Sequence, residues 1–276
     1  GATATGPDGA TGAAGPAGAD GADGVVNGVA CEVNQIVRYN GSAWVCATDP
    51  FANLSCSAGD TLTYNGSAFT CSCAPPGTPI TNSNFNAAIT DWIASGDASH
   101  YGDITKWCTG AVTDMSEAFQ NKATFNEDIS GWDTSQVTTM SLMFRGAAAF
   151  NQSIGSWNTG KVEYMGAIFS NATFFNKNIS TWDTSKVTSM EYMFYGAAAF
   201  NQDIGIWNTS AVANMLGMFW GAANFNQDLS NWNGSSLNFC TTFANNATAW
   251  LNAYGGSIAG KNPPLSASLI TAGCGN

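Results

Sequence analysis

The most constraining feature of the sequence is a tryptophan that recurs every 25 residues. Columns of valine, methionine, phenylalanine and asparagine keep the same register. A fixed period of this length is typical of a chain of coils in which no coil buries its apolar side alone, so that each stacks on the next. The tryptophans are therefore predicted to lie in a continuous core: Trp107, Trp132, Trp157, Trp182, Trp207 and Trp232.

Methionines and phenylalanines in the same register are predicted to share this core: Met140, Met165, Met190, Phe144, Phe169 and Phe194. A sugar-stacking platform is the alternative role for the tryptophans. The core is favoured because the residues at i−3 and i+5 from each tryptophan are apolar. Stacked coils would bring like residues together at about 4.8 Å, the spacing of paired strands. The asparagine that follows one phenylalanine of each coil is then expected to form a ladder.

Within one coil, Val137, Met140, Phe144 and Ala147 have the spacing of one face of a helix or of 3₁₀ turns. Asp, Thr and Ser at 133–135 supply oxygens for an Asx turn and a helix N-cap. Gly146 is a natural helix stop. Residues 150–157 are expected to form an extended arm with Ile154 and Trp157 pointing inward.

The consensus FNxxIxxWxTxxVxxMxxMF resembles the 25-residue surface-protein repeat, a relative of the BspA-type leucine-rich repeats of bacterial and mycoplasmal surface proteins. The resemblance covers about residues 85–245. It implies a leucine-rich-repeat-like α+β solenoid, a cell-surface location, and adhesion or partner binding, and it supplies no catalytic residues. We place the solenoid at 108–250 and its caps at 75–107 and 251–276, because the repeat becomes irregular at both ends.

Glycine occupies every third position from Gly6 to Gly24. In a collagen triple helix every third residue lies at a crowded axis that admits only glycine. Residues 1–24 are therefore expected to form a collagen-like stalk that joins three chains, although a flexible linker is the alternative. So short a run needs further triplets before Gly1 or neighbouring domains to hold it together. The axial residues would be Gly6, Gly9, Gly12, Gly15, Gly18, Gly21 and Gly24.

Residues 25–74 contain a second duplication, in which Cys31 to Cys46 and Cys56 to Cys71 share the frame TyrAsnGlySerAla. Asparagine followed by glycine between alternating apolar residues favours a hairpin with a two-residue type I′ turn. We therefore expect two small cysteine-bracketed β-hairpin modules. They resemble units that follow collagen-like stretches in bacterial surface and phage tail-fibre proteins.

The even number of cysteines in this lysine-poor chain favours disulfides and an oxidising location over a zinc site. Pairing within each hairpin module is expected first, with bridges between chains of a trimer as the alternative. Disulfides are also expected to fix the caps, with Cys274 as the partner of Cys240. The disulfide candidates are Cys31, Cys46, Cys56, Cys71, Cys73, Cys108, Cys240 and Cys274.

The sequence carries no catalytic motif, so we predict that it is not an enzyme. A Ser/His/Asp arrangement would depend on His100, the single histidine. Acidic residues change from coil to coil, as solvated faces do, and this disfavours a glycosidase carboxylate pair. No cofactor is predicted; the alternative is calcium bound by Asp and Asn oxygens, for which no EF-hand or RTX pattern marks a position. A formal net charge of −11 excludes nucleic acid as a partner, and the absence of a long apolar run excludes membrane insertion by this chain.

Together these features predict a non-catalytic extracellular protein on a cell surface or a virion appendage. A trimeric stalk would present the solenoid to a surface receptor, a matrix protein or a glycan. The alternative is a structural subunit that polymerises into an extracellular filament.

Overall fold

The computed structural model describes residues 80–95, 101–253, 267–271 and 274, together with four strands between residues 35 and 72. The chain divides into two compact units, one made of residues 1–56 and 62–72 and the other of residues 57–61 and 73–276. The collagen-like glycines, His100, Cys31, Cys56 and Cys73 lie outside the described residues, as do the side chains of Cys46 and Cys71.

The first unit contains two paired-strand sheets. Strands β1 (Gln35–Tyr39) and β2 (Trp44–Thr48) pair antiparallel, and the ladder ends with Tyr39 opposite Trp44. This register leaves residues 40–43 between the strands, so the predicted two-residue connection is too short. Strands β3 (Thr61–Tyr64) and β4 (Phe69–Ser72) form the second sheet.

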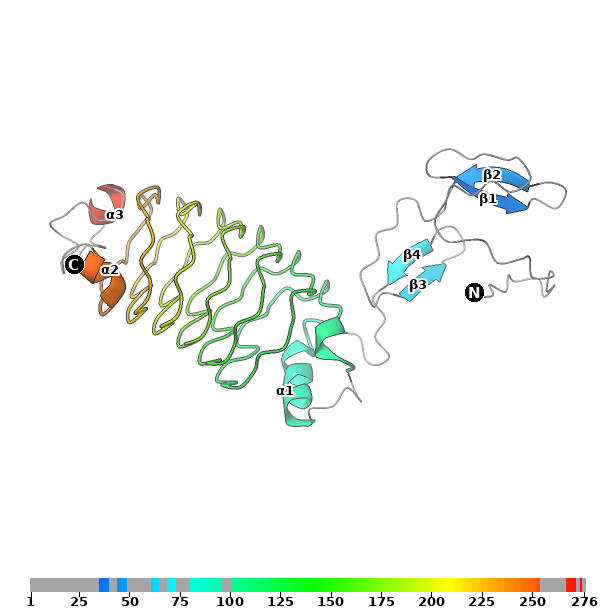
Figure 1. Ribbon diagram of the computed structural model, residues 1–276, viewed down its shortest axis with the longest axis horizontal. Coiled ribbons are helices and arrows are strands. Elements are labelled where there is room, and N and C mark those ends of the chain that lie inside the picture. Colours follow the sequence, from blue (N-terminus) through cyan, green and yellow to red (C-terminus); the bar gives the residue numbers. More distant parts are fainter. Residues whose placement is uncertain are drawn as a thin grey trace. The chain divides into compact units, whose positions relative to one another are not determined.

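The second unit is dominated by 25-residue coils that lie side by side between helices α1 (Phe85–Ser95) and α2 (Thr248–Ala253) (Figure 1). We number them coil 1 (108–132), coil 2 (133–157), coil 3 (158–182), coil 4 (183–207), coil 5 (208–232) and coil 6 (233–250). Successive coils are joined by isolated parallel bridges, which run from Asp114 through Thr139, Tyr164, Ser189 and Asn214 to Phe239. The leucine-rich-repeat class and the domain boundaries stay predictions.

Of the two interpretations of the segment from Val137 to Ala147, the continuous helix is wrong; the structure has a series of turns closed by bonds three residues back, the bonding of 3₁₀ turns. In coil 2 the amide of Met143 donates to the carbonyl of Met140, and the amide of Ala147 donates to that of Phe144, both three residues back. The alternate amides donate to the next coil instead: that of Leu142 to Gly166, and that of Phe144 to Ile168. Because alternate amides bond to the next coil, this segment does not form a continuous helix. Gly146 therefore does not act as the predicted helix stop.

The predicted extended arm also differs from the structure. Among the described residues the parallel bridges fall at Thr139 and its equivalents, not on residues 150–157. Ile154 and Trp157 are nevertheless buried, at 0% and 3% exposure. Polar side chains fasten this arm, because the amide of Asn151 donates to Oδ1 of Asn126 at 2.8 Å. The same bond recurs along Asn176, Asn201 and Asn226, which confirms the asparagine ladder.

The core consists of side-chain columns that run through the coils. All the tryptophans, methionines and phenylalanines assigned to the core by the sequence analysis are buried. Phe144 and Phe169 stack with ring centroids 5.7 Å apart, and Trp157 and Trp182 with centroids 6.5 Å apart. These distances exceed the strand spacing because parallel rings pack with a lateral offset.

Two buried hydrogen-bond columns tie each coil to its neighbours. The indole Nε1–H of Trp182 donates to the carbonyl of Ile154 in the preceding coil at 3.0 Å, and Trp132, Trp157, Trp207 and Trp232 repeat this bond. The hydroxyl of Thr159 donates to the carbonyl of Asp183 in the following coil at 3.0 Å. These bonds let the core bury polar groups with their partners satisfied.

The first coil is covered by α1 and by the short 3₁₀ helix η1 (Ile104–Lys106). Phe85 of α1 lies edge-on against Trp132, with ring centroids 5.5 Å apart. The Asn82 side-chain oxygen accepts from the amides of Thr113 and Asp114 at 3.1 and 2.9 Å. Asn82 thereby satisfies backbone donors at the bridge edge that precedes coil 2.

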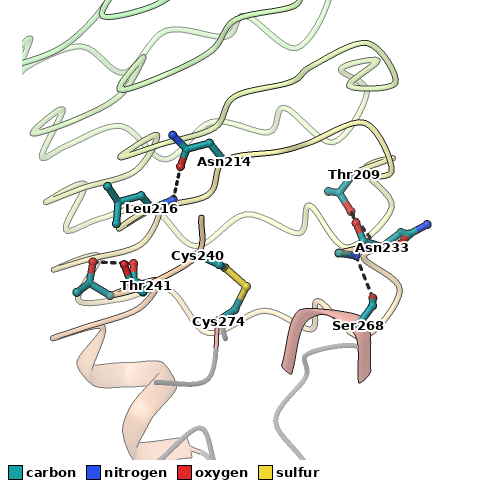
Figure 2. Close-up of a disulfide and its surroundings, with 10 residues drawn as sticks. Thr209, Asn214, Leu216, Asn233, Cys240, Thr241, Ser268 and Cys274 are labelled. Atoms are coloured by element: carbon teal, nitrogen blue, oxygen red, sulfur yellow. Dashed lines mark hydrogen bonds between the residues drawn. A yellow bond between two sulfur atoms is a disulfide. The ribbon is translucent and has the colours of Figure 1, made fainter. Parts of the chain in front are cut away.

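The last coil is covered by α2 and by helix α3 (Ala267–Thr271). A disulfide joins Cys240 of coil 6 to Cys274, as Figure 2 shows. The hydroxyl of Ser268 on α3 accepts from the amide of Gly234 at 2.9 Å. At the other end of the coils the disulfide expected for Cys108 is absent: Cys108 is a free thiol, and its Sγ lies 3.9 Å from the carbonyl of Lys106.

Candidate functional site

The coils share their core residues but differ on one outer surface, which we call the wall. It consists of residues 116–121, 141–146, 166–171, 191–196, 216–221 and 241–246. The position of Arg145 holds Ser170, Tyr195 and Trp220 in the next three coils, whereas the neighbouring core column is phenylalanine from Phe119 to Phe219. A surface that varies on a constant scaffold is where specific recognition can be built.

Two columns of the wall have left-handed backbone. One contains Leu142 at φ 63°, Ala167 at 53° and Tyr192 at 51°, and the other contains Gly146 at 71° and Asn171 at 57°. Glycine and asparagine accept this conformation readily, but leucine and tyrosine do so at a cost. The inter-coil bonds hold it in place, since the amide of Ala167 donates to the carbonyl of Glu191 and that of Tyr192 to Leu216.

A hollow of about 600 Å³ opens on the wall where coil 3 carries small residues. Ala167 and Ser170 are buried, at 9% and 4% exposure, and both line the hollow. The same two positions hold Leu142 and Arg145 in coil 2 and the larger Tyr192 and Tyr195 in coil 4. Coil 3 therefore supplies the floor of the hollow, and coils 2 and 4 supply its two opposite sides.

Three aromatic side chains form one end of the hollow. The rings of Tyr192 and Tyr195 meet edge to face, with centroids 5.8 Å apart and an angle of 82°. Trp220 packs against Tyr195 at 5.7 Å and 58°. Gly217 provides the space behind Tyr192, because a Cβ there would lie 2.6 Å from Cε1 of the tyrosine. The aromatic end is thus supported by a residue that has no side chain.

The polar groups of the hollow carry opposite charges. Nδ2 of Asn214 donates to Oε2 of Glu191 at 2.6 Å, which fixes the carboxylate, and the Glu191 stem covers Gly166. Arg145 lies across the floor in coil 2, and Asn171 adds an amide. Within the part of the chain that the structure describes, Arg145 forms no ion pair. Both charged groups can therefore contact a ligand.

A second hollow, of about 350 Å³, lies beside α1 and is lined by Trp92, Ile93, Lys122, Phe125 and Glu127 among others. Its lining comes from α1 and coil 1, and it has fewer aromatic groups than the hollow of coils 2–5.

Away from the wall, Asx turns line the coils. Hydrogen bonds from the side chain and the amide of Ser185 hold the pKa of Asp183 below its ordinary value, and Ser130 does the same for the pKa of Asp128.

The predicted site residues that the structure describes, apart from the free thiol of Cys108, lie in structural positions. The tryptophan, methionine and phenylalanine columns lie in the core, and Cys240 and Cys274 pair at the C-terminal cap. The described residues contain no group of three His, Cys, Asp or Glu side chains that could hold a metal ion. None of the helices that the structure describes is long and apolar enough to cross a membrane.

The wall hollow was not among the features predicted from the sequence. The available signal was a column that changes from Arg145 through Ser170 to Tyr195 and Trp220 within otherwise constant repeats. Coil 3 has the small residues Ala167 and Ser170 where coil 4 has Tyr192 and Tyr195. This difference indicates a hollow only once the geometry of the coils is known.

Comparisons with known proteins agree with the repeat. Two overlapping stretches, residues 92–182 and 161–255, match one family, described as Mycoplasma protein of unknown function, DUF285. No curated protein and no solved structure matches the chain. Because the matched stretches together cover more than half of the chain and coincide with the coils, the chain is a repeat protein that belongs to the DUF285 family of Mycoplasma proteins.

Proposed function

We propose that the chain is a non-catalytic surface protein whose coils bind an extracellular partner through the hollow on the wall. The observation that carries this proposal is the contrast between the core columns and the wall. Core positions are repeated from coil to coil, whereas the wall changes at Arg145, Ser170 and Tyr195 and gathers aromatic and charged groups in one place. Exposed aromatic and arginine side chains in a concave surface are typical of binding sites.

In this proposal the coils form a leucine-rich-repeat-like solenoid that serves as a rigid scaffold for adhesion. The match to a Mycoplasma repeat family and the resemblance to surface-protein repeats support a location at a cell surface. The glycine triplets of residues 1–24 are proposed to join three chains, which would multiply the strength of weak individual contacts. Light scattering of the full chain beside a variant without residues 1–24 tests this part: three chains in the first and fewer in the second support it, and one chain in both overturns it.

Binding of the fluorescently labelled full chain to cell monolayers and to immobilised matrix proteins tests the main proposal. Ala167→Leu should fill the hollow without new backbone strain, because leucine already occupies the same position of coil 2, at Leu142. Ser156→Ile is the matched control, since coil 4 carries Ile206 at that position with 72% exposure and neither residue lines the hollow.

We expect Ala167→Leu to reduce surface binding at least about tenfold and Ser156→Ile to leave it unchanged. Equal binding by both variants would place the contact elsewhere on the chain. Absence of surface binding by the wild-type chain, together with long uniform filaments in electron micrographs, would favour the structural-subunit alternative.

A further inference from the structure

We propose that the hollow of coils 2–5 binds a neutral sugar ring of a glycan. This inference rests on the proposed function, because it names the chemistry of the partner that the wall would recognise. It is separate from the tryptophan columns, which are core residues and present no surface to a ligand.

The shape of the hollow fits a single sugar ring between two opposite sides. Adjacent coils are spaced so that the rings of Phe144, Phe169 and Phe194 stack at 5.7 Å in each step. The two sides of the hollow, at Arg145 and Tyr195, are two coils apart, and Ser170 in the coil between them is small and buried. The gap left over coil 3 is wide enough for a saturated ring that stands on its edge. The two faces of that ring then contact the two sides of the hollow.

The aromatic end of the hollow offers π-surfaces to the C–H groups of a sugar. Tyr192, Tyr195 and Trp220 are all partly exposed, so their rings are accessible. The face of an aromatic ring carries negative partial charge, and the axial C–H groups of a pyranose carry positive partial charge. Because Gly217 backs Tyr192, a ligand can press against that ring without displacing it.

The polar groups complement hydroxyls. An ionised carboxylate only accepts hydrogen bonds and a guanidinium only donates them, whereas a hydroxyl does both. The carboxylate of Glu191, whose Oε2 accepts from Nδ2 of Asn214 at 2.6 Å, supplies hydrogen-bond acceptors. Arg145 supplies donors on the opposite side of the hollow. Asn171 can do either. A ligand rich in hydroxyls is the class that uses both kinds of partner.

Charge favours a neutral glycan over charged ligands. Glu191 and Arg145 balance each other within the hollow, and the chain as a whole has a formal net charge of −11. An acidic glycan would meet that excess negative charge. A quaternary ammonium would gain from the aromatic rings and Glu191, but the Arg145 guanidinium would oppose it.

Isothermal titration calorimetry of the full chain tests the proposal. The probes are maltotriose, cellotriose, chitotriose and N-acetyllactosamine as neutral saccharides, 3′-sialyllactose as the acidic one, and choline chloride as the cation. We expect at least one neutral saccharide to bind and choline not to bind. Binding of choline alone, or of none of the neutral saccharides, would overturn the proposal.

Variants locate the binding. Ala167→Leu and Tyr195→Ala should each weaken the saccharide affinity at least about tenfold. Tyr195→Phe keeps the ring and should stay within about threefold of the wild-type affinity. Ser156→Ile should bind as the wild type does, and circular dichroism melts identify any variant that has lost its fold. Full saccharide affinity in both Ala167→Leu and Tyr195→Ala would exclude the hollow as the site.

Glycan removal separates this inference from the proposed function. If periodate treatment of the cell surface abolishes binding of the chain, the glycan inference is supported. If the chain still binds treated cells and Ala167→Leu abolishes that binding, the hollow contacts a protein, so the glycan inference fails while the adhesive function stands.

Discussion

Replacing Trp182 removes an indole from the middle of the coils. Its side chain is 3% exposed, and its ring lies 5.9 Å from Phe169, 6.5 Å from Trp157 and 6.4 Å from Trp207. Neighbours on every side are held by their own columns, so they cannot close the space. We therefore expect Trp182→Ala to lower the free energy of unfolding by about 3–5 kcal/mol.

Trp182→Phe isolates the hydrogen bond from the packing. Phenylalanine keeps most of the apolar surface but cannot donate to the carbonyl of Ile154, which Nε1 of Trp182 reaches at 3.0 Å. That carbonyl also accepts from the amide of Trp157 and so keeps one partner. The hydrogen-bond loss should therefore cost about 1 kcal/mol.

Urea denaturation followed by far-ultraviolet circular dichroism measures both variants. Each coil contacts only its neighbours, so Trp182→Ala should also broaden the transition by weakening the link between the two halves. Trp220→Ala, at a partly exposed wall position, is the control and should cost about 1 kcal/mol. Equal destabilisation by Trp182→Ala and Trp220→Ala would refute the assignment of the tryptophan column to the core.

Three further perturbations test other parts of the structure. Gly217→Ala should destabilise the fold by more than the roughly 1–2 kcal/mol expected for its positive φ of 57°, because the new Cβ would meet the Tyr192 ring at 2.6 Å; thermal melts measure this. Reduction of the Cys240–Cys274 disulfide, which closes a separation of 34 residues, should lower the unfolding free energy by about 3–4 kcal/mol in chemical denaturation with and without reductant. Since the pKa of Asp183 is lowered in the folded state, its stabilising contribution is present above the unfolded pKa and is lost as the pH falls through the folded pKa; Asp183→Asn should remove this part of the acid dependence in pH-dependent melts.

Matched residues provide the controls. Gly221→Ala has a similar φ of 72° but its Cβ would meet nothing closer than 3.7 Å, so only the backbone cost should remain; equal losses at both glycines would contradict the Tyr192 contact. Alkylation without reductant should modify Cys108 and spare Cys240 and Cys274, and the opposite pattern would refute the assigned bridge. Asn208, at the position of Asp183 in coil 5, makes the same turn without a charge, so the substitution should keep the turn; an unchanged acid dependence would show that Asp183 is not responsible.

The position of the core could be read from the sequence because a stack of coils demands the same chemistry at the same position. Trp157, Met165 and Phe169 point inward for this reason, whatever the local backbone does. The local backbone could not be read in the same way. The spacing of Val137 and Met140 suits a helix, but amides such as that of Leu142 bond to the next coil, and a single coil considered alone contains no sign of these partners.

The wall hollow was beyond prediction for a related reason. Leucine and tyrosine disfavour positive φ, so nothing local indicates that Leu142 and Tyr192 adopt it. The floor of the hollow depends on this backbone, and so does its aromatic end.

Hydroxyl-radical footprinting of the full chain, free and bound to its target cell surface, tests most directly whether the hollow is the recognition site. This measurement reads the solvent accessibility of tyrosine, tryptophan and phenylalanine side chains. We predict that binding protects Tyr192, Tyr195 and Trp220 from oxidation, while Tyr164 and Phe174, which are 49% and 65% exposed away from the hollow, react as in the free chain. Protection of Tyr164 and Phe174 with unchanged oxidation of the hollow would contradict this prediction.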